Sequence, residues 1–302
     1  MGTLERKHSA PGGEKDYAER MNVVLNTVST AASGALPCLG SRSDEGVVIE
    51  PDWPVPARVH ALMSTRMGGC SAPPWDSLNL GAHVGDVPEH VAHNRARWQK
   101  VLGRRPVYLS QVHGTESVTL SHDSADGLQA DVCECLDSAV AATVMVADCM
   151  PVLMSDARGQ WVSAGHAGWR GLAGRDGHGV LEVMVRLAAQ RGVASQDLRV
   201  WLGPCIGPQA FEVGDEVRQT FVRQHQQAVA FFIATGDQGK WLAHLPGLAR
   251  LRLQLLGVDA VYGNDGAQAW CTVAQSSLFF SHRRDSQRLG GSGRMAASIW
   301  LE

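Results

Sequence analysis

The sequence predicts an α+β fold in which mixed β-sheets are flanked by helices. Short apolar segments of strand length alternate along the chain with longer segments whose apolar residues recur at helical spacing. Two of the short segments are separated only by Asp156-Ala157-Arg158-Gly159, which is typical of the turn of an antiparallel hairpin. Hairpins among helices indicate mixed sheets and not a regular array of parallel β-α-β units.

The first predicted helix begins beside Asp86 and Pro88. We expect Asp86 to cap its N-terminus and Pro88 to occupy its first turn, where the missing amide hydrogen of proline costs nothing. Val91 and Trp98 then fall on one helical face, and Gly103 ends the apolar pattern.

The predicted strands are best marked by residues 141–147, a continuous run of small and apolar residues typical of a strand buried on both faces. Residues 152–155 and 161–164 are the two strands of the hairpin. The remaining strands are expected at residues 107–112, 117–120, 200–202, 258–262 and 278–281, and the remaining helices at residues 177–190, 213–224 and 242–256.

The first 48 residues differ from the rest of the chain. They are rich in Ser, Gly, Ala and charged residues and lack sustained periodicity, so residues 1–48 are expected to be a poorly ordered N-terminal extension. Residues 49–302 are expected to form a single catalytic domain, which is compatible with the size of one large domain.

Composition excludes several classes of protein. The formal net charge of −3 gives no basic surplus with which to bind nucleic acid, and hydrophobic residues make up 44% of the chain, as in globular proteins. No apolar run approaches the roughly 20 residues of a membrane-spanning helix. Seven cysteines, an odd number without framework spacing, indicate reduced thiols and a cytoplasmic location. The sequence does not specify an oligomeric state.

Three short motifs each place a metal-binding side chain beside small or turn-forming residues. His113 stands in QVHG, Cys149 in ADCMP and His166 in AGHAGWRG. Two histidines and one cysteine are a common ligand set for a catalytic zinc, which keeps its fourth position open for water or substrate. All three lie at the ends of predicted strands, where side chains of separate strands can converge. The sequence therefore predicts a catalytic metal site formed by these three residues.

Each of the three residues also has an ordinary structural explanation. A histidine at a strand end often only hydrogen-bonds within the fold, and a buried cysteine often packs as a small apolar residue. The predicted hairpin joins Cys149 to His166 and makes their proximity plausible, whereas the approach of His113 does not follow from spacing. A metal-free alternative makes Cys149 a nucleophile with one of the histidines as its base.

Four polar residues are candidates for substrate contacts. Arg170 follows His166 closely, and a guanidinium beside a metal suits a phosphate or carboxylate group. Arg66 and Asn79 lie in loop-rich segments, and Arg283 lies at the end of a predicted strand. Asp148 either orients a ligand histidine or caps a turn.

Over residues 54–301 the chain resembles the laccase-domain, or YfiH-type, proteins, which are also described as purine nucleoside phosphorylases and peptidoglycan editing factors. Besides the three motifs above, the resemblance includes the ordered segments TRxGG from Thr65, SLNLG from Ser77, GD from Gly85, NR from Asn94, LGP from Leu202, FEV from Phe211 and RRD from Arg283. The chain departs from the family pattern at His282, where a tyrosine is more usual.

The resemblance implies an α/β/β/α sandwich and a metal bound by His113, Cys149 and His166, with zinc expected and copper as the alternative. It also implies phosphorolysis of adenosine, inosine and methylthioadenosine, with adenosine deamination as a further activity. The partners would then be a purine nucleoside and phosphate, with no nucleic acid and no membrane.

Four other functions are weighed against this one. They are a Cys-His hydrolase, an amidase that edits peptidoglycan precursors, a copper-dependent polyphenol oxidase and a non-catalytic binding protein. The oxidase fits the sequence poorly, because no His-x-His pair is present to supply a multicopper cluster. The sequence also lacks the His-Glu-x-x-His motif of zinc proteases and the paired motifs of nucleoside deaminases.

Overall fold

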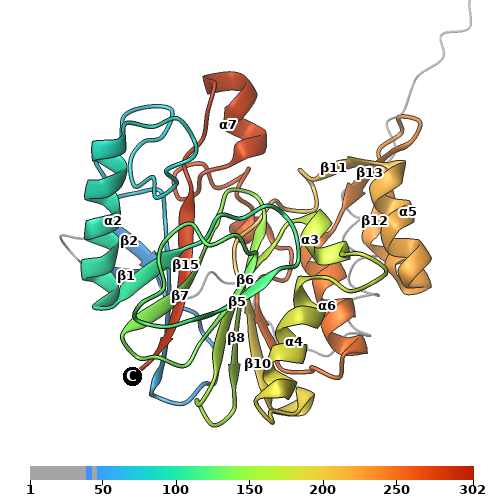
Figure 1. Cartoon of the computed structure of the whole chain (residues 1–302). Coiled ribbons are helices and arrows are strands. Elements are labelled where there is room, and N and C mark those ends of the chain that lie inside the picture. Colours follow the sequence, from blue (N-terminus) through green and yellow to red (C-terminus); the bar gives the residue numbers. More distant parts are fainter. Residues whose placement is uncertain (1–38, 43–45) are drawn as a thin grey trace, which may run out of the picture.

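The computed structural model describes residues 39–42 and 46–302, in which two six-stranded sheets lie face to face (Figure 1). Helix α2 (Pro88–Leu102) covers the outer face of the first sheet, and α4 (Val180–Gln190) and α6 (Leu245–Leu255) cover the outer face of the second. This order of layers confirms the predicted α+β fold with mixed sheets and its α/β/β/α arrangement.

The first sheet is mixed, because β4 pairs with β7 in parallel and the other neighbours pair antiparallel. Its strands run in the order β1 (Leu39–Arg42), β2 (Gly46–Ile49), β3 (Val59–Ser64), β15 (Met295–Leu301), β7 (Val140–Val146) and β4 (Arg105–Tyr108).

The second sheet is mixed as well, with parallel pairs at its two edges. Its strands run in the order β14 (Val261–Gly263), β10 (Leu198–Leu202), β8 (Met150–Asp156), β9 (Val162–Ala167), β6 (Val132–Cys135) and β5 (Ser117–Leu120).

A third, three-stranded sheet stands beside the second one with helix α5, at the right of Figure 1. It consists of β11 (Glu212–Gly214), β13 (Lys240–Ala243) and β12 (Phe232–Ala234). The remaining helical elements are α3 (Trp169–Ala173), α5 (Asp215–Gln224), α7 (His282–Leu289), and the short 3-10 turns η1 (Ser195–Asp197), η2 (Gln226–Phe231) and η3 (Gln268–Trp270).

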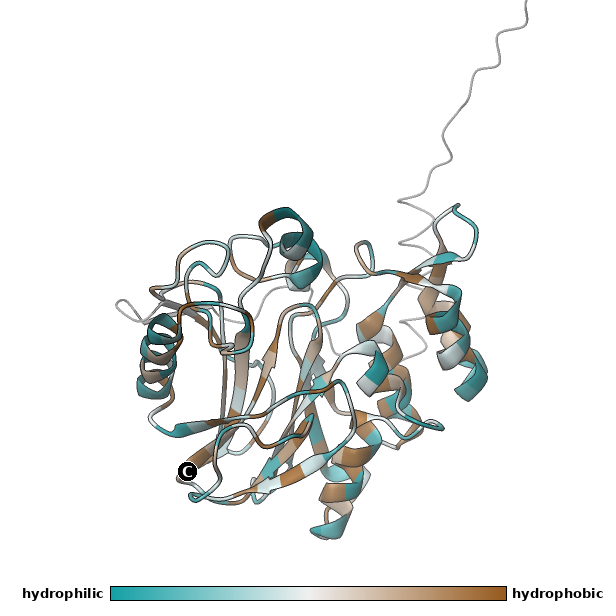
Figure 2. Ribbon diagram, turned by 45° about the horizontal axis from the view of Figure 1, so that its top comes forward, coloured by the Kyte–Doolittle hydropathy of each residue, from teal (hydrophilic) through white to brown (hydrophobic). Residues whose placement is uncertain are grey.

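Helix α2 follows its sequence pattern closely. Val91 and Trp98 are buried against the first sheet, and Gly103 ends the helix in the left-handed conformation that glycine adopts readily. In Figure 2 this helix is mostly hydrophilic, whereas the strands beneath it are largely hydrophobic. The prediction that Asp86 caps the helix was wrong, because Val87 occupies the capping position and the Asp86 carboxylate bonds instead to Ser71 and Asn79.

The hairpin and the buried strand were also predicted correctly. Strands β8 and β9 pair antiparallel around the expected turn, with Ser155 opposite Val162. Strand β7 is buried along its whole length, since it lies inside one sheet and between two layers. The described part of the chain contains no helix long and apolar enough to cross a membrane.

Several predicted elements shift or disappear. The strand expected at residues 107–112 ends at Tyr108, and the helix expected at residues 213–224 begins only after β11. Residues 278–281 form no strand. They lie in a turn that leads into α7, from which the side chains of Phe279 and Phe280 are buried in the core. An apolar run shows that a segment is buried, but it does not specify the backbone conformation.

Several strands were not predicted, namely β1, β3, β6, β15 and all three strands of the third sheet. The most consequential of them is β15, which pairs with both β3 and β7 in the middle of the first sheet. It has no polar alternation, because both its faces are buried, and so it lacks the usual pattern of a half-exposed strand. The expected extension of residues 1–48 lies outside the described residues except for β1 and the first residues of β2.

Candidate metal centre and its cavity

The strand topology explains how three distant residues meet. Because β4 and β7 are parallel, the segments that leave them, which carry His113 and Cys149, emerge at the same edge of the first sheet. The chain then crosses directly from β7 into β8 of the second sheet. Strand β9 returns antiparallel to β8, with His166 opposite Pro151, so His166 lies beside Cys149.

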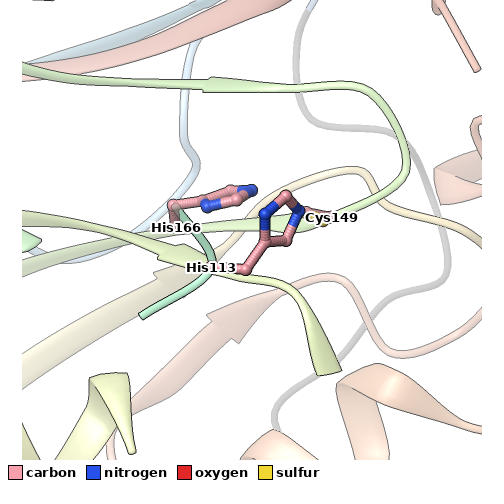
Figure 3. A group of neighbouring side chains, drawn as sticks. All are labelled: His113, Cys149 and His166. Carbon is pink, nitrogen blue, oxygen red and sulfur yellow. The ribbon is translucent and has the colours of Figure 1, made fainter. Parts of the chain in front are cut away.

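The donor atoms of His113, Cys149 and His166 all lie within 4.8 Å of one another. The two imidazole rings meet edge to face, with centroids 4.8 Å apart and planes inclined by 68°. Figure 3 shows the imidazole rings of His113 and His166 close together, with Cys149 beside them on a separate segment. The three residues therefore converge as the sequence-based hypothesis requires. His113 is exposed to solvent, Cys149 is half-buried and His166 is buried.

Asp131 organises this cluster, although sequence analysis did not select it. Its fully buried carboxylate accepts a hydrogen bond of 2.7 Å from Nδ1 of His166. The same carboxylate accepts the backbone N–H groups of Val112, His113 and Gly114. One side chain thus orients His166, leaves its Nε2 free for another partner, and fixes the backbone that carries His113.

The charges of the cluster favour a thiolate. Burial by itself raises the pKa of the Cys149 thiol, but the neighbouring imidazoles of His166 and His113 outweigh burial and lower it. Burial likewise opposes the charge of His166, but Cys149 and Asp131 raise its pKa. Without a metal, Cys149 and His166 therefore favour a thiolate and an imidazolium, and the thiolate is the form of cysteine that binds metals.

Two residues of the cluster's backbone adopt positive φ angles, 59° at His113 and 85° at Asp148. Such angles are uncommon outside glycine, and both occur where the chain turns sharply to present a donor. Gly168 lies against the cluster, and a Cβ at this position would meet Sγ of Cys149 at 2.8 Å and Cδ2 of His113 at 3.0 Å. Only glycine leaves room for the donors here.

The cluster opens into a cavity of about 370 Å³. This volume lies within the range of small-molecule sites, and the walls combine a few polar groups with apolar side chains. Besides the three donors, the cavity is lined by His83, Gln111, Met145, Ala147, Asp148, Gly168, Trp169, Arg170, Ile206, Phe211, Leu245, His282, Arg283 and Arg294.

Two of the predicted substrate contacts do not line this cavity. Arg66 pairs with Asp76 and donates to the carbonyl of Ser276, so its guanidinium is held in a loop outside the cavity. Asn79 is fully buried, and its amide bonds to Gly81 and Asp86. Both residues stand in turn-forming sequence, and their side chains hold the surrounding loops in place.

Arg170 and Arg283, the other two candidates for substrate contacts, do line the cavity. Both are exposed: Arg170 lies over the ring of Trp169, and Arg283 donates to the carbonyl of Glu212. Asp148 does not orient either histidine. Its two carboxylate oxygens accept from the Thr272 hydroxyl and from the backbone N–H of Arg283.

Sequence analysis did not identify several other residues of the cavity. The side-chain amide of Gln111 bonds to the backbone of Met145 twice, because its nitrogen donates to the Met145 carbonyl and its oxygen accepts from the Met145 N–H. His83 and Arg294 reach the cavity from segments far apart in sequence. For Asp131, a signal was available, because an aspartate at the start of an apolar strand is unusual unless it is paired. No comparable signal marks His83.

The donor set fits a bound metal ion. Zinc takes nitrogen and sulfur ligands at about 2.0–2.3 Å, so small side-chain rotations suffice to bring the three donors onto one ion. Asp131 supplies the carboxylate that commonly supports a ligand histidine. The same donors also suit copper, so the donor chemistry supports a metal without selecting between the two.

The family model described as multi-copper polyphenol oxidoreductase laccase matches residues 60–302. A purine nucleoside phosphorylase of Pseudomonas aeruginosa is 46% identical over 254 residues, which are 84% of this chain and 98% of that protein. The purine nucleoside phosphorylase YfiH of Escherichia coli is 45% identical over 256 residues, again 84% of this chain and 98% of that protein.

Solved structures of similar proteins also match this chain over most of its length. A crystal structure of a Neisseria meningitidis protein matches with a TM-score of 0.76 at 42% identity, and covers 84% of this chain and 99% of that one. The hypothetical protein YfiH of Bacillus licheniformis matches with the same TM-score at 28% identity, and covers 86% of this chain and 98% of that one.

Proposed function

This chain belongs to the multi-copper polyphenol oxidoreductase laccase family, and from its donor cluster and the names of its relatives we propose that it is a metal-dependent purine nucleoside phosphorylase. The observation that carries the proposal is the donor cluster at the wall of a cavity with cationic side chains. The names of its relatives support the choice of substrate.

Phosphorolysis transfers the ribosyl group from the purine to inorganic phosphate. A phosphate oxygen forms a bond to the ribose C1′ atom while the bond from C1′ to the purine nitrogen breaks. The electron pair of that bond leaves with the purine, which takes up the proton that phosphate gives up. The products are ribose 1-phosphate and the free base.

The residues of the cavity suit these tasks. Arginine side chains hold phosphate through paired hydrogen bonds, and Trp169 and Phe211 offer apolar surface to a purine. His113, Cys149 and His166 would hold the metal, with Asp131 keeping Nδ1 of His166 protonated. Such an ion would act as a Lewis acid that stabilises developing negative charge.

Adenosine, inosine and methylthioadenosine are the proposed substrates, zinc is the proposed metal with copper as the alternative, and adenosine deamination is a further proposed activity. The cavity volume supports a ligand of nucleoside size. A peptidoglycan fragment is considerably larger, so the same volume weighs against an editing amidase.

A Cys-His hydrolase is the second candidate, because the lowered pKa of Cys149 beside His166 is also what a cysteine nucleophile needs. Iodoacetamide separates the two. If Cys149 is a metal ligand, added zinc protects it from alkylation and the metal-free protein has no turnover. Amidase activity in metal-free protein that is lost on alkylation would favour the hydrolase.

The proposed function is tested by replacing Cys149 with Ala. We expect bound metal, measured by elemental analysis on untagged protein, and ribose 1-phosphate formation from adenosine to disappear together, because the cluster loses its only thiolate. Cys70→Ala is the matched control, since Cys70 is exposed and lies outside the cavity. Undiminished phosphorolysis in Cys149→Ala rules out this mechanism, and oxidation of phenols by the copper-loaded protein alone would support the oxidase.

A further inference from the structure

Arg294 is the most sheltered of the three arginines that line the cavity. It is half-buried, whereas Arg170 and Arg283 are exposed. Its Nη1 donates to the carbonyls of Ser292 and Gly293, at 2.9 and 3.1 Å. Among residues 39–42 and 46–302, no carboxylate forms an ion pair with Arg294, and its Nε and Nη2 have no hydrogen-bond partner. A sheltered cation with free donors beside a cavity is suited to an anionic ligand.

The position of Arg294 is fixed by a buried network. Its backbone N–H donates to Oδ1 of Asn79 at 2.8 Å, and its carbonyl accepts from the N–H of Leu80. The amide of Asn79 is fixed in turn by Asp86 at 2.8 Å. The stem of the Arg294 side chain packs on Gly81, where a Cβ would lie 2.7 Å from its Cγ. This arginine is therefore preorganised, immediately before the central strand β15 (Figure 1).

The surroundings of Arg294 also favour an anion near the metal donors. His83 lines the same cavity and feels the charge of Arg294. Burial and, next, this charge lower the pKa of His83, so a neutral imidazole is available to share a hydrogen bond. Asp148 is the acidic side chain of the cavity wall, and both its oxygens are already engaged by Thr272 and by the backbone of Arg283. Its charge and that of Cys149 act on the Arg294 guanidinium through space, but Asp148 forms no ion pair or hydrogen bond with it among the described residues, so the free donors of Arg294 stay available to a ligand.

We propose that inorganic phosphate binds at Arg294, which donates to it from Nε and Nη2 beside His83, and that the exposed Arg170 and Arg283 face the nucleoside instead. This inference rests on the proposed phosphorolysis for its role in the reaction, but not for the binding itself. It reassigns Asn79 from substrate contact to the residue that anchors the phosphate-binding arginine.

The test measures phosphate in two ways, by calorimetric titration of inorganic phosphate into the metal-loaded protein and by steady-state kinetics with phosphate varied at saturating adenosine. In Arg294→Gln we expect phosphate affinity to fall and the phosphate KM to rise about tenfold or more, as for one lost charge-assisted contact. The adenosine KM should change by less than about twofold, because the nucleoside contacts remain.

Gly81→Ala provides a second variant that retains the guanidinium but displaces its stem, and its backbone has no positive φ that would strain alanine. It should raise the phosphate KM in the same direction. Arg288→Gln is the matched control, since the Arg288 side chain is 67% exposed and lies outside the cavity. Melting temperatures establish that each variant is folded.

The possible outcomes separate this inference from the proposed function. An unchanged phosphate KM and affinity in Arg294→Gln, or a tenfold rise in Arg283→Gln instead, overturns the inference and leaves phosphorolysis standing. Phosphate binding that is lost in Arg294→Gln, in a protein that forms no ribose 1-phosphate, supports the inference and overturns the proposed function.

Discussion

Two buried carboxylates stand three residues apart and serve different purposes: Asp131 immediately precedes β6, and Glu134 lies within that strand. Each is at most 1% exposed. Glu134 accepts from the Thr119 hydroxyl, from Nε1 of Trp161 and from the guanidinium of Arg191. None of these three donors lines the cavity. Asp131 accepts from three backbone N–H groups and from His166, whose other ring nitrogen faces the cavity.

The difference shows that burial of a charge does not by itself mark a functional site. Both carboxylates have a lowered pKa, because hydrogen bonds to the charged form outweigh the opposing effect of burial. What distinguishes Asp131 is that one of its donors has a second polar atom that is open to a ligand. A buried carboxylate is informative about function when its partner leads to a cavity.

Asp131→Asn should have the largest effect. The substitution keeps the shape but removes the charge and one of the two acceptor oxygens. The amide NH2 must then face one of two pairs of donors, either His166 Nδ1 with the His113 N–H or the N–H groups of Val112 and Gly114. We expect metal affinity and turnover to fall by about 10–100-fold, the usual effect of losing the group that supports a ligand histidine. Competition with a metal-binding dye measures the affinity. Wild-type affinity in a folded variant would contradict the role assigned to Asp131.

Glu134→Gln is the matched variant, and it should alter stability without altering activity. It leaves donors without a charged acceptor in a buried position, at a cost of about 1–3 kcal/mol in the free energy of unfolding. Denaturant titration measures this loss. Turnover per folded molecule should equal that of the wild type, and a tenfold loss would place Glu134 in the functional network.

The stability difference between the wild type and Glu134→Gln should depend on pH. Because the pKa of Glu134 is lower in the folded state than in the unfolded chain, its contribution is present above the unfolded value of about 4.3 and is lost as the pH falls through the folded value. Unfolding curves from pH 7 to pH 3 should therefore converge. A constant difference across that range would show that the lost contribution is packing and not charge.

Arg191→Lys should have the smallest effect. The Arg191 side chain is 40% exposed, and a lysine at this position retains the charge but loses the paired geometry toward both oxygens of Glu134. We expect a loss below about 1 kcal/mol, as for partly exposed ion pairs. A loss as large as that of Glu134→Gln would show that the guanidinium supplies most of the stabilisation of this carboxylate.

The local sequence pattern was sufficient to predict those elements whose conformation depends on residues close together in the chain. The face and the C-terminal glycine of α2, the β8–β9 hairpin and the buried strand β7 follow from spacing, turn residues and composition. The same hairpin explains why Cys149 and His166 lie together. The hairpin requires contacts only between residues close in the chain, so its geometry is contained in the local sequence.

Predictions failed where the answer depended on distant segments. Strand β15 has no polar alternation because two sheets bury it, and Asn79 was taken for a substrate contact although its partner Arg294 stands 215 residues away. The sequence of a loop shows that a polar residue is available. It does not show which buried group that residue will satisfy.

By itself the sequence determined the chemical types of the donors, their places beside tight turns and the mixed α+β class, because these depend on side-chain identity and on neighbours in the chain. Only the tertiary structure decided that His113 joins the other two, that Asp131 holds them and that Arg294 faces the cavity. Those contacts join segments from both sheets and both ends of the domain, and they exist only once the layers pack and the buried polar groups find partners.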